Sequence, residues 1–100
     1  MNIAILGASG RFGRAFTAKL LTNPNYQLTV ISRTVRNIFE DSHRVTAKNV
    51  DCTNLKDLKG ALENQDIVYC AVSGSDLPVI ARNLCEIKPK RVIWMSVVGI

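Results

Sequence analysis

Apolar residues occur along the chain in five short runs, separated by segments whose apolar positions are spaced as in helices. The runs cover residues 2–6, 27–32, 44–50, 66–72 and 91–97. Four of them are rich in β-branched residues and carry little charge, which is typical of strands buried on both faces of a parallel sheet. The run at 44–50 alternates apolar and polar residues and is predicted to be an edge strand. The chain is therefore expected to alternate strands and helices.

The first helix is predicted between the first two strands. Its apolar stripe consists of Phe12, Ala15, Phe16 and Leu20, and we expect this stripe to face the sheet. Pro24 prevents the helix from continuing. The helix therefore lies directly after the first strand.

Two more helices are predicted in the second half of the chain. Asn54 is a suitable N-cap for a helix at 55–63, and either Ser75 or Asp76 can cap a helix at 77–87. Together with right-handed crossovers, these elements predict an α/β fold of the Rossmann type. We expect one domain with a doubly wound parallel sheet of five strands in the order 3-2-1-4-5.

A glycine-rich stretch follows the first strand and opens the first helix. Gly7 permits a tight exit from the strand, Gly10 lets the backbone approach a pyrophosphate, and Gly13 lets the helix pack closely on the strand. Backbone N–H groups and the helix dipole can then hold the anion. This placement favours dinucleotide binding over a turn that only tightens the junction. The predicted binding stretch is Gly7, Ala8, Ser9, Gly10, Arg11, Phe12 and Gly13.

The end of the second strand indicates which dinucleotide is bound. Folds that use NAD place an acidic residue about 20 residues after the glycines, where it accepts a hydrogen bond from the ribose 2′-hydroxyl. Here the strand ends in Ser32 and Arg33, and the nearest acids, Glu40 and Asp41, come later. A guanidinium can hold a 2′-phosphate, and Ser32 adds a hydroxyl. NADP(H) is therefore predicted in preference to NAD(H), with Arg11 as a second clamp.

Two further loops are expected at the same edge of the sheet. Asp51 and Cys52 follow the third strand, where an acidic loop can accept from the adenine amino group; turn formation or helix capping by Asp51 is an equal alternative. After the fourth strand, Gly74 allows close approach of the backbone to the cofactor. Trp94 is predicted to fill the core. The second loop contributes Ala71, Val72, Ser73 and Gly74 to the predicted cofactor site.

The net charge of +5 is concentrated in the first part of the chain. Residues 40–100 carry eight basic and eight acidic side chains, whereas residues 1–39 carry no acid and five basic side chains, Arg11, Arg14, Lys19, Arg33 and Arg36. An anionic ligand at the glycine loop accounts for Arg11 and Arg33, whereas Arg14, Lys19 and Arg36 are expected on a solvated surface. No nucleic-acid recognition element is visible, so we predict no nucleic-acid partner.

The sequence does not predict a membrane or metal site. No apolar run approaches the roughly 20 residues that cross a bilayer, and the N-terminus does not resemble a signal peptide, so a cytoplasmic protein is expected. Cys52, Cys70 and Cys85 are odd in number and have no Cys-x-x-Cys spacing, and His43 is the one histidine. We therefore expect reduced thiols and no metal.

The combined motifs resemble a known family over essentially the whole chain. Gly7-x-x-Gly10-x-x-Gly13 is joined by Ser32-Arg33, Asp51-x-Thr53, Ala71-Val72-Ser73-Gly74 and Ser96. This combination is similar to the atypical short-chain dehydrogenase/reductase superfamily, and its nearest branch is the NmrA-like NAD(P)H-binding proteins. The resemblance implies hydride transfer between NADPH and a small carbonyl compound. It also implies that Ser96 stands where the superfamily often has a catalytic serine.

The chain departs from that family in two ways. The family's Tyr-x-x-x-Lys motif is missing, because Tyr26 is followed four positions later by Val30, and Tyr69 by Ser73. No helix or sixth strand follows the fifth strand, so we expect either an incomplete domain or a second chain, a homo-oligomer or another partner, covering that edge. The alternatives to a reductase are a non-catalytic NAD(P)H-sensing regulator and an interaction fragment without turnover.

Overall fold

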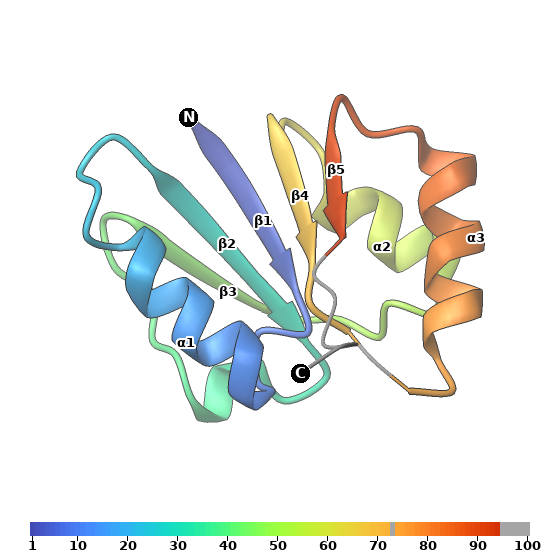
Figure 1. The fold of residues 1–100 in the computed structure, drawn as a ribbon, viewed down its shortest axis with the longest axis horizontal. Helices are drawn as coiled ribbons and strands as arrows, with labels where there is room; N and C mark the ends of the chain where they lie inside the picture. Colours follow the sequence, from blue (N-terminus) through green and yellow to red (C-terminus); the bar gives the residue numbers. More distant parts are fainter. Residues whose placement is uncertain (73, 95–100) are drawn as a thin grey trace.

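The computed structural model describes residues 1–72 and 74–94, which form a five-stranded parallel sheet in the order β3-β2-β1-β4-β5 (Figure 1). Each of the four strand pairs is parallel. The predicted Rossmann-type α/β fold and its strand order are thus confirmed. The strands are β1 (Asn2–Leu6), β2 (Gln27–Ser32), β3 (Val45–Asn49), β4 (Ile67–Cys70) and β5 (Val92–Trp94).

Helices cover both faces of the sheet. They are α1 (Arg11–Leu20), α2 (Leu55–Ala61) and α3 (Leu77–Ile87), with a short 3-10 turn, η1 (Val35–Asn37), after β2. In Figure 1, α1 lies on one side of the sheet, while α2 and α3 lie on the other. The expected N-cap of α2 is confirmed, since the Asn54 side chain accepts a hydrogen bond from the Asp57 N–H at 3.1 Å.

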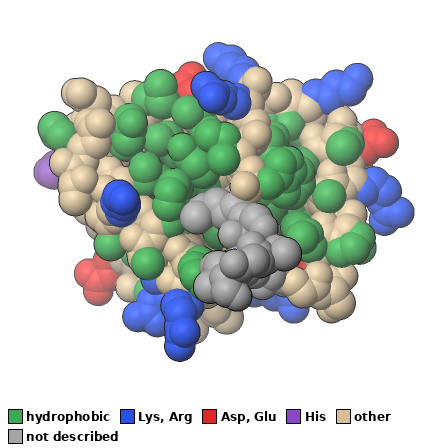
Figure 2. Space-filling view, in the orientation of Figure 1, with side chains coloured by type: hydrophobic (Ala, Val, Ile, Leu, Met, Phe, Trp, Pro, Cys, Tyr) green, Lys and Arg blue, Asp and Glu red, His purple; other side chains and the backbone are tan. Residues whose placement is uncertain are grey.

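The core consists of two hydrophobic clusters, one on each face of the sheet. Alternate residues of β1 enter different clusters: Ala4 and Leu6 pack with α2 and α3, whereas Ile3 and Ile5 pack toward α1. All four are essentially fully buried. The α1 side is less completely covered, and Figure 2 shows hydrophobic side chains gathered on the part of this face that α1 does not reach.

The predicted face of α1 is partly wrong. Gly13 and Thr17 are the buried residues of the helix, whereas Phe12 is 47% exposed. A Cβ on Gly13 would overlap with the Gly7 carbonyl oxygen and lie 2.8 Å from the Ala8 Cα. This close backbone contact rotates the helix so that Gly13, not Phe12, faces the sheet. The buried Thr17 hydroxyl is satisfied because it donates to the Gly13 carbonyl at 2.7 Å.

Several element ends also differ from the prediction. β4 ends at Cys70, and α2 ends at Ala61. Trp94, which was expected in the core, is 48% exposed at the end of β5. The remainder of the predicted fifth strand, 95–97, lies outside the described residues.

Arg44 fastens the loop between α1 and β2, a role that the sequence did not reveal. Its guanidinium donates to the carbonyl oxygens of Leu21 at 2.9 Å, Tyr26 at 3.3 Å and Asn23. These contacts join the turn after α1 to the start of β3. Of the helices in the described ranges, none has the length and hydropathy needed to cross a membrane.

Candidate cofactor-binding site

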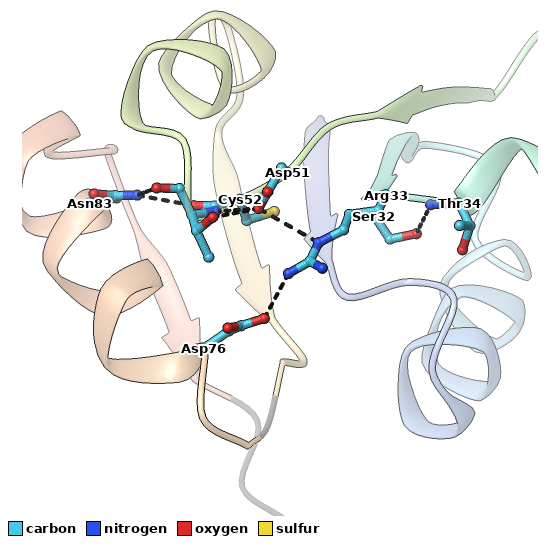
Figure 3. A network of polar contacts seen from close by, with 8 residues as sticks. Ser32, Arg33, Thr34, Asp51, Cys52, Asp76 and Asn83 are labelled. Atoms are coloured by element: carbon cyan, nitrogen blue, oxygen red, sulfur yellow. Dashed lines mark hydrogen bonds and ion pairs between the residues drawn. The ribbon is translucent and has the colours of Figure 1, made fainter.

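A cavity of about 370 Å³ opens at the carboxyl ends of the strands. Loops after β1, β2, β3 and β4 meet there because the parallel strands all end at the same edge of the sheet. The N-terminal part of α3 closes the remaining side (Figure 3). The lining residues are Gly7, Ser9, Ser32, Arg33, Thr34, Val50, Asp51, Cys52, Thr53, Val72, Asp76 and Ile80.

The glycine loop brings the start of α1 close to this cavity. Gly7 has a φ of 75°, and a Cβ there would lie 2.9 Å from the Val72 Cγ2, so a larger residue is excluded both by conformation and by space. Gly10 is the N-cap of α1. No side chain caps this helix, and its first turn holds no acidic residue. The N-terminal N–H groups of α1 are therefore available for an anion such as a pyrophosphate.

Arg33 extends across the cavity from the end of β2 to the start of α3 (Figure 3). Its Nη2 donates to the Asp76 Oδ2 at 2.8 Å, and its Nε lies 3.7 Å from the Asp51 Oδ1. The Arg33 side chain is 61% exposed, so it remains accessible to a ligand. Beside it, the Ser32 hydroxyl oxygen accepts from the Thr34 N–H at 3.3 Å and holds the turn in place.

Asp51 organises the loop after β3. Its Oδ1 accepts from the Thr53 hydroxyl at 2.6 Å and from the Thr53 N–H at 3.0 Å. These hydrogen bonds hold the pKa of Asp51 below its usual value, and the positive charge of Arg33 adds to the effect. The turn-forming role, one of the two alternatives from the sequence, is therefore present in the structure.

Cys52 contributes an apolar wall to the cavity. Burial raises the pKa of its thiol to about 12, and the neighbouring Cys70 and Asp51 act in the same direction. The thiol therefore stays protonated at neutral pH, which makes it a poor nucleophile.

Asn83 fixes the same loop from α3, a role that the sequence did not predict. The side chain is buried, and its amide donates to the Cys52 and Thr53 carbonyl oxygens, both at 3.0 Å. The one signal in the sequence was an amide among the apolar residues of a helix. Asp76 was also missed as a site residue: it is the N-cap of α3, but its side chain makes no cap hydrogen bond and pairs with Arg33 instead.

The other predicted site residues take different positions. Ala8 and Gly13 are buried members of the glycine-rich stretch, whereas Arg11 and Phe12 are exposed at the start of α1 and do not line the cavity. Gly74 has a φ of 93°, a conformation that favours glycine. Within residues 1–72 and 74–94, Arg11 forms no ion pair. Ser73 and Ser96 lie outside the described residues.

Comparison with known proteins agrees with this fold. A short-chain dehydrogenase/reductase of wide type from Veillonella parvula DSM 2008, solved in complex with NADP, superimposes with a TM-score of 0.80 at 32% identity over 98% of this chain and 48% of that one. A Rossmann-fold NAD(P)-binding family protein from Shigella flexneri gives a TM-score of 0.76 at 27% identity, over 91% of this chain and 49% of that one.

The family assignment follows from the sequence comparison. The profile of the NAD(P)H-binding family matches residues 7–100, and the chain belongs to this family. The predicted membership of the short-chain dehydrogenase/reductase group is confirmed, and an NmrA-like protein fits the same family. The chain is also 28% identical to a glutamyl-tRNA reductase from Cyanophora paradoxa, over 96% of this chain and 22% of that protein. The chain thus spans less than half the length of each of these three proteins.

Proposed function

We propose that the cavity holds the adenosine end of NADP(H), with the pyrophosphate at the N-terminus of α1. The observation that carries this proposal is the position of Arg33, an exposed guanidinium beside the Ser32 hydroxyl at the edge of the cavity. A guanidinium and a hydroxyl are suitable donors for a 2′-phosphate. The NADP in the similar Veillonella parvula structure supports the same choice.

The remaining predicted contacts follow from this placement. The loop at 51–53 lies opposite Arg33 and would face the adenine, while Val72 and Gly7 would lie against the pyrophosphate. The bound nicotinamide would supply hydride chemistry. As part of a cytoplasmic protein of the reductase class, the domain would present NADPH to a small carbonyl compound, with Ser96 orienting the carbonyl.

A second function, sensing of NAD(P)H without turnover, is favoured by the positions of the two tyrosines. Tyr69 lies within β4, where its ring packs on Phe16 with centroids 4.6 Å apart. Tyr26 precedes β2 and thus lies at the opposite edge of the sheet from the cavity. Neither phenol can donate a proton to a substrate at the cavity, which is the role of the family's tyrosine. A tyrosine in this role is therefore not among the described residues.

Calorimetric titration with NADPH and NADH tests the cofactor assignment. We expect saturable binding that favours NADPH. Arg33→Ala should weaken NADPH binding by about 1.5–3 kcal/mol, the range for a hydrogen bond to a charged group, and should leave NADH binding nearly unchanged. Arg82→Ala is the matched control, because Arg82 is an exposed arginine of α3 outside the cavity lining. Equal losses for both cofactors in Arg33→Ala would refute the 2′-phosphate contact.

NADPH oxidation assays distinguish the two functions. A panel of small aldehydes, ketones and enones is mixed with NADPH and the protein, and absorbance of the reduced nicotinamide is followed. Turnover of any of these compounds supports the reductase. Tight NADPH binding without turnover supports the sensor.

A further inference from the structure

The pairing of Arg33 with Asp76 has a consequence for cofactor selectivity. The two residues are 43 positions apart in sequence, and they meet across the mouth of the cavity at 2.8 Å. Asp76 has no other side-chain hydrogen bond among the described residues, and it leaves α3 without a side-chain cap. Among the described residues, the Asp76 side chain is therefore hydrogen-bonded to Arg33 alone.

The Asp76 carboxylate accepts a hydrogen bond from the same Arg33 guanidinium that the proposed function assigns to the 2′-phosphate. Asp51 adds a second negative charge at 3.7 Å from the same guanidinium. The three side chains together carry one net negative charge, although Arg33 alone would attract a phosphate. A 2′-phosphate brings further negative charge, so it competes with the Asp76 carboxylate for the positive charge of Arg33 and for the N–H donors of Nη2.

The geometry points to Asp76 as a specificity-determining residue that limits the preference for NADP(H) over NAD(H) by competing with the 2′-phosphate for Arg33. This inference rests on the proposed function. NADH has no 2′-phosphate and gains nothing from Arg33, so Asp76 lowers the affinity for NADPH alone. Asp51 has a different role, since its Oδ1 is also held by Thr53.

The solvent exposure of the Arg33–Asp76 ion pair determines how strongly Asp76 can change the affinity for NADPH. The side chains of Arg33 and Asp76 are 61% and 48% exposed, so water and salt screen their attraction. Exposed ion pairs of this kind change an equilibrium by roughly two- to fivefold. We therefore expect Asp76→Asn to strengthen NADPH binding roughly two- to fivefold at low salt, and less at high salt.

Asp76→Asn is a mild change for the fold. Asparagine is among the preferred N-cap residues, so α3 keeps a suitable first residue. Asp76→Glu keeps the carboxylate and should bind both cofactors like the unmodified chain. Glu86→Gln is the matched control, because it removes the same charge from an exposed position near the other end of α3.

The experiment is a calorimetric titration of these variants with NADPH and NADH, and with two fragments, adenosine 2′,5′-bisphosphate and 5′-AMP. The fragments differ only in the 2′-phosphate. Asp76→Asn should bind NADPH and the bisphosphate more tightly and leave NADH and AMP unchanged. In an Arg33→Ala background, the same substitution should lose most of its effect, because the competing partner is gone.

Two results overturn the inference. NADPH binding that is unchanged or weaker in Asp76→Asn would mean that Asp76 does not compete with the phosphate. An equal gain for NADH would mean that Asp76 only obstructs the cavity.

The Arg33→Ala variant separates failure of this inference from failure of the proposed function. If Arg33→Ala keeps the full NADPH preference, the proposed phosphate contact fails as well. If Arg33→Ala removes the preference while Asp76→Asn changes nothing, the role of Asp76 alone is refuted.

Discussion

The contact between Gly13 and the glycine loop determines how α1 lies on the sheet, and Gly13→Ala tests it directly. The added Cβ would overlap with the Gly7 carbonyl oxygen and lie 2.8 Å from the Ala8 Cα. Both neighbours are backbone atoms in a tight turn, so neither can rotate away as a flexible side chain would. The helix itself has to move.

Two opposing effects determine how much Gly13→Ala changes the free energy of unfolding. Alanine is a better helix former than glycine by about 0.8–1.0 kcal/mol in a helix interior. Inserting a carbon into a closely packed site costs about 1–3 kcal/mol, and contacts with rigid backbone belong to the upper part of that range. We expect the free energy of unfolding to fall by about 1–2 kcal/mol, and the melting temperature by about 4–8 °C for each kcal/mol.

Gly60→Ala provides a control with the opposite sign. Gly60 lies in α2, is exposed, and a Cβ there would meet no atom within 4 Å. The same substitution should therefore raise the free energy of unfolding by up to about 1 kcal/mol. Urea unfolding followed by circular dichroism measures both variants against the unmodified chain.

The result that would refute this reasoning is a Gly13→Ala variant as stable as the unmodified chain. Such a result would mean that α1 can shift without loss and that the close contact does not hold it. Weaker NADPH binding should accompany the loss of stability, because the displaced helix carries the N–H groups proposed to hold the pyrophosphate. Gly60→Ala should leave NADPH binding unchanged.

Three other predictions concern the loop after β3 and the thiols. Asn83→Ala leaves two carbonyl oxygens without their donor and should lower the free energy of unfolding by about 1–3 kcal/mol in urea titrations, with weaker NADPH binding. The pKa of Asp51 is lower in the folded state, so its contribution to stability is present above its unfolded value and is lost as the pH falls through the folded value. Thr53→Val should reduce this loss, and an unchanged pH dependence of unfolding would contradict the role of the Thr53 hydrogen bonds. An aromatic disulfide reagent should modify the exposed Cys85 rapidly and the buried Cys52 only on unfolding; mass spectrometry of the native protein identifies the labelled residue.

The sheet could be predicted because its order follows from simple constraints. Buried parallel strands produce continuous apolar runs such as 27–32, and right-handed crossovers then leave few possible arrangements. The position of the site follows from the same constraints, since the carboxyl ends of β1, β2 and β3 lie at one edge. The sequence therefore indicated where Gly7, Arg33 and Asp51 would meet.

The face of α1 could not be predicted from its apolar residues. The stripe that includes Phe12 gives the direction of greatest hydrophobicity, but the helix turns Gly13 and Thr17 toward the sheet. The reason is the close approach of the backbone at Gly13, which brings α1 nearer to β1 than a side chain would allow. A glycine in such a helix can thus determine packing more strongly than an aromatic residue.

The polar contacts of the site depend on distances that the sequence does not contain. The sequence predicted Arg33 as a phosphate ligand because no acid stands in its place after β2, yet acidic side chains from two other loops lie close to it in space. Asp51 lies at the end of a neighbouring strand, and Asp76 lies at the start of a helix on the far side of the cavity. A selectivity rule based only on the residue after β2 treats Arg33 as a free charge. Because the guanidinium is already paired, we expect the proposed preference for NADP(H) to depend on Asp76 as well as on Arg33.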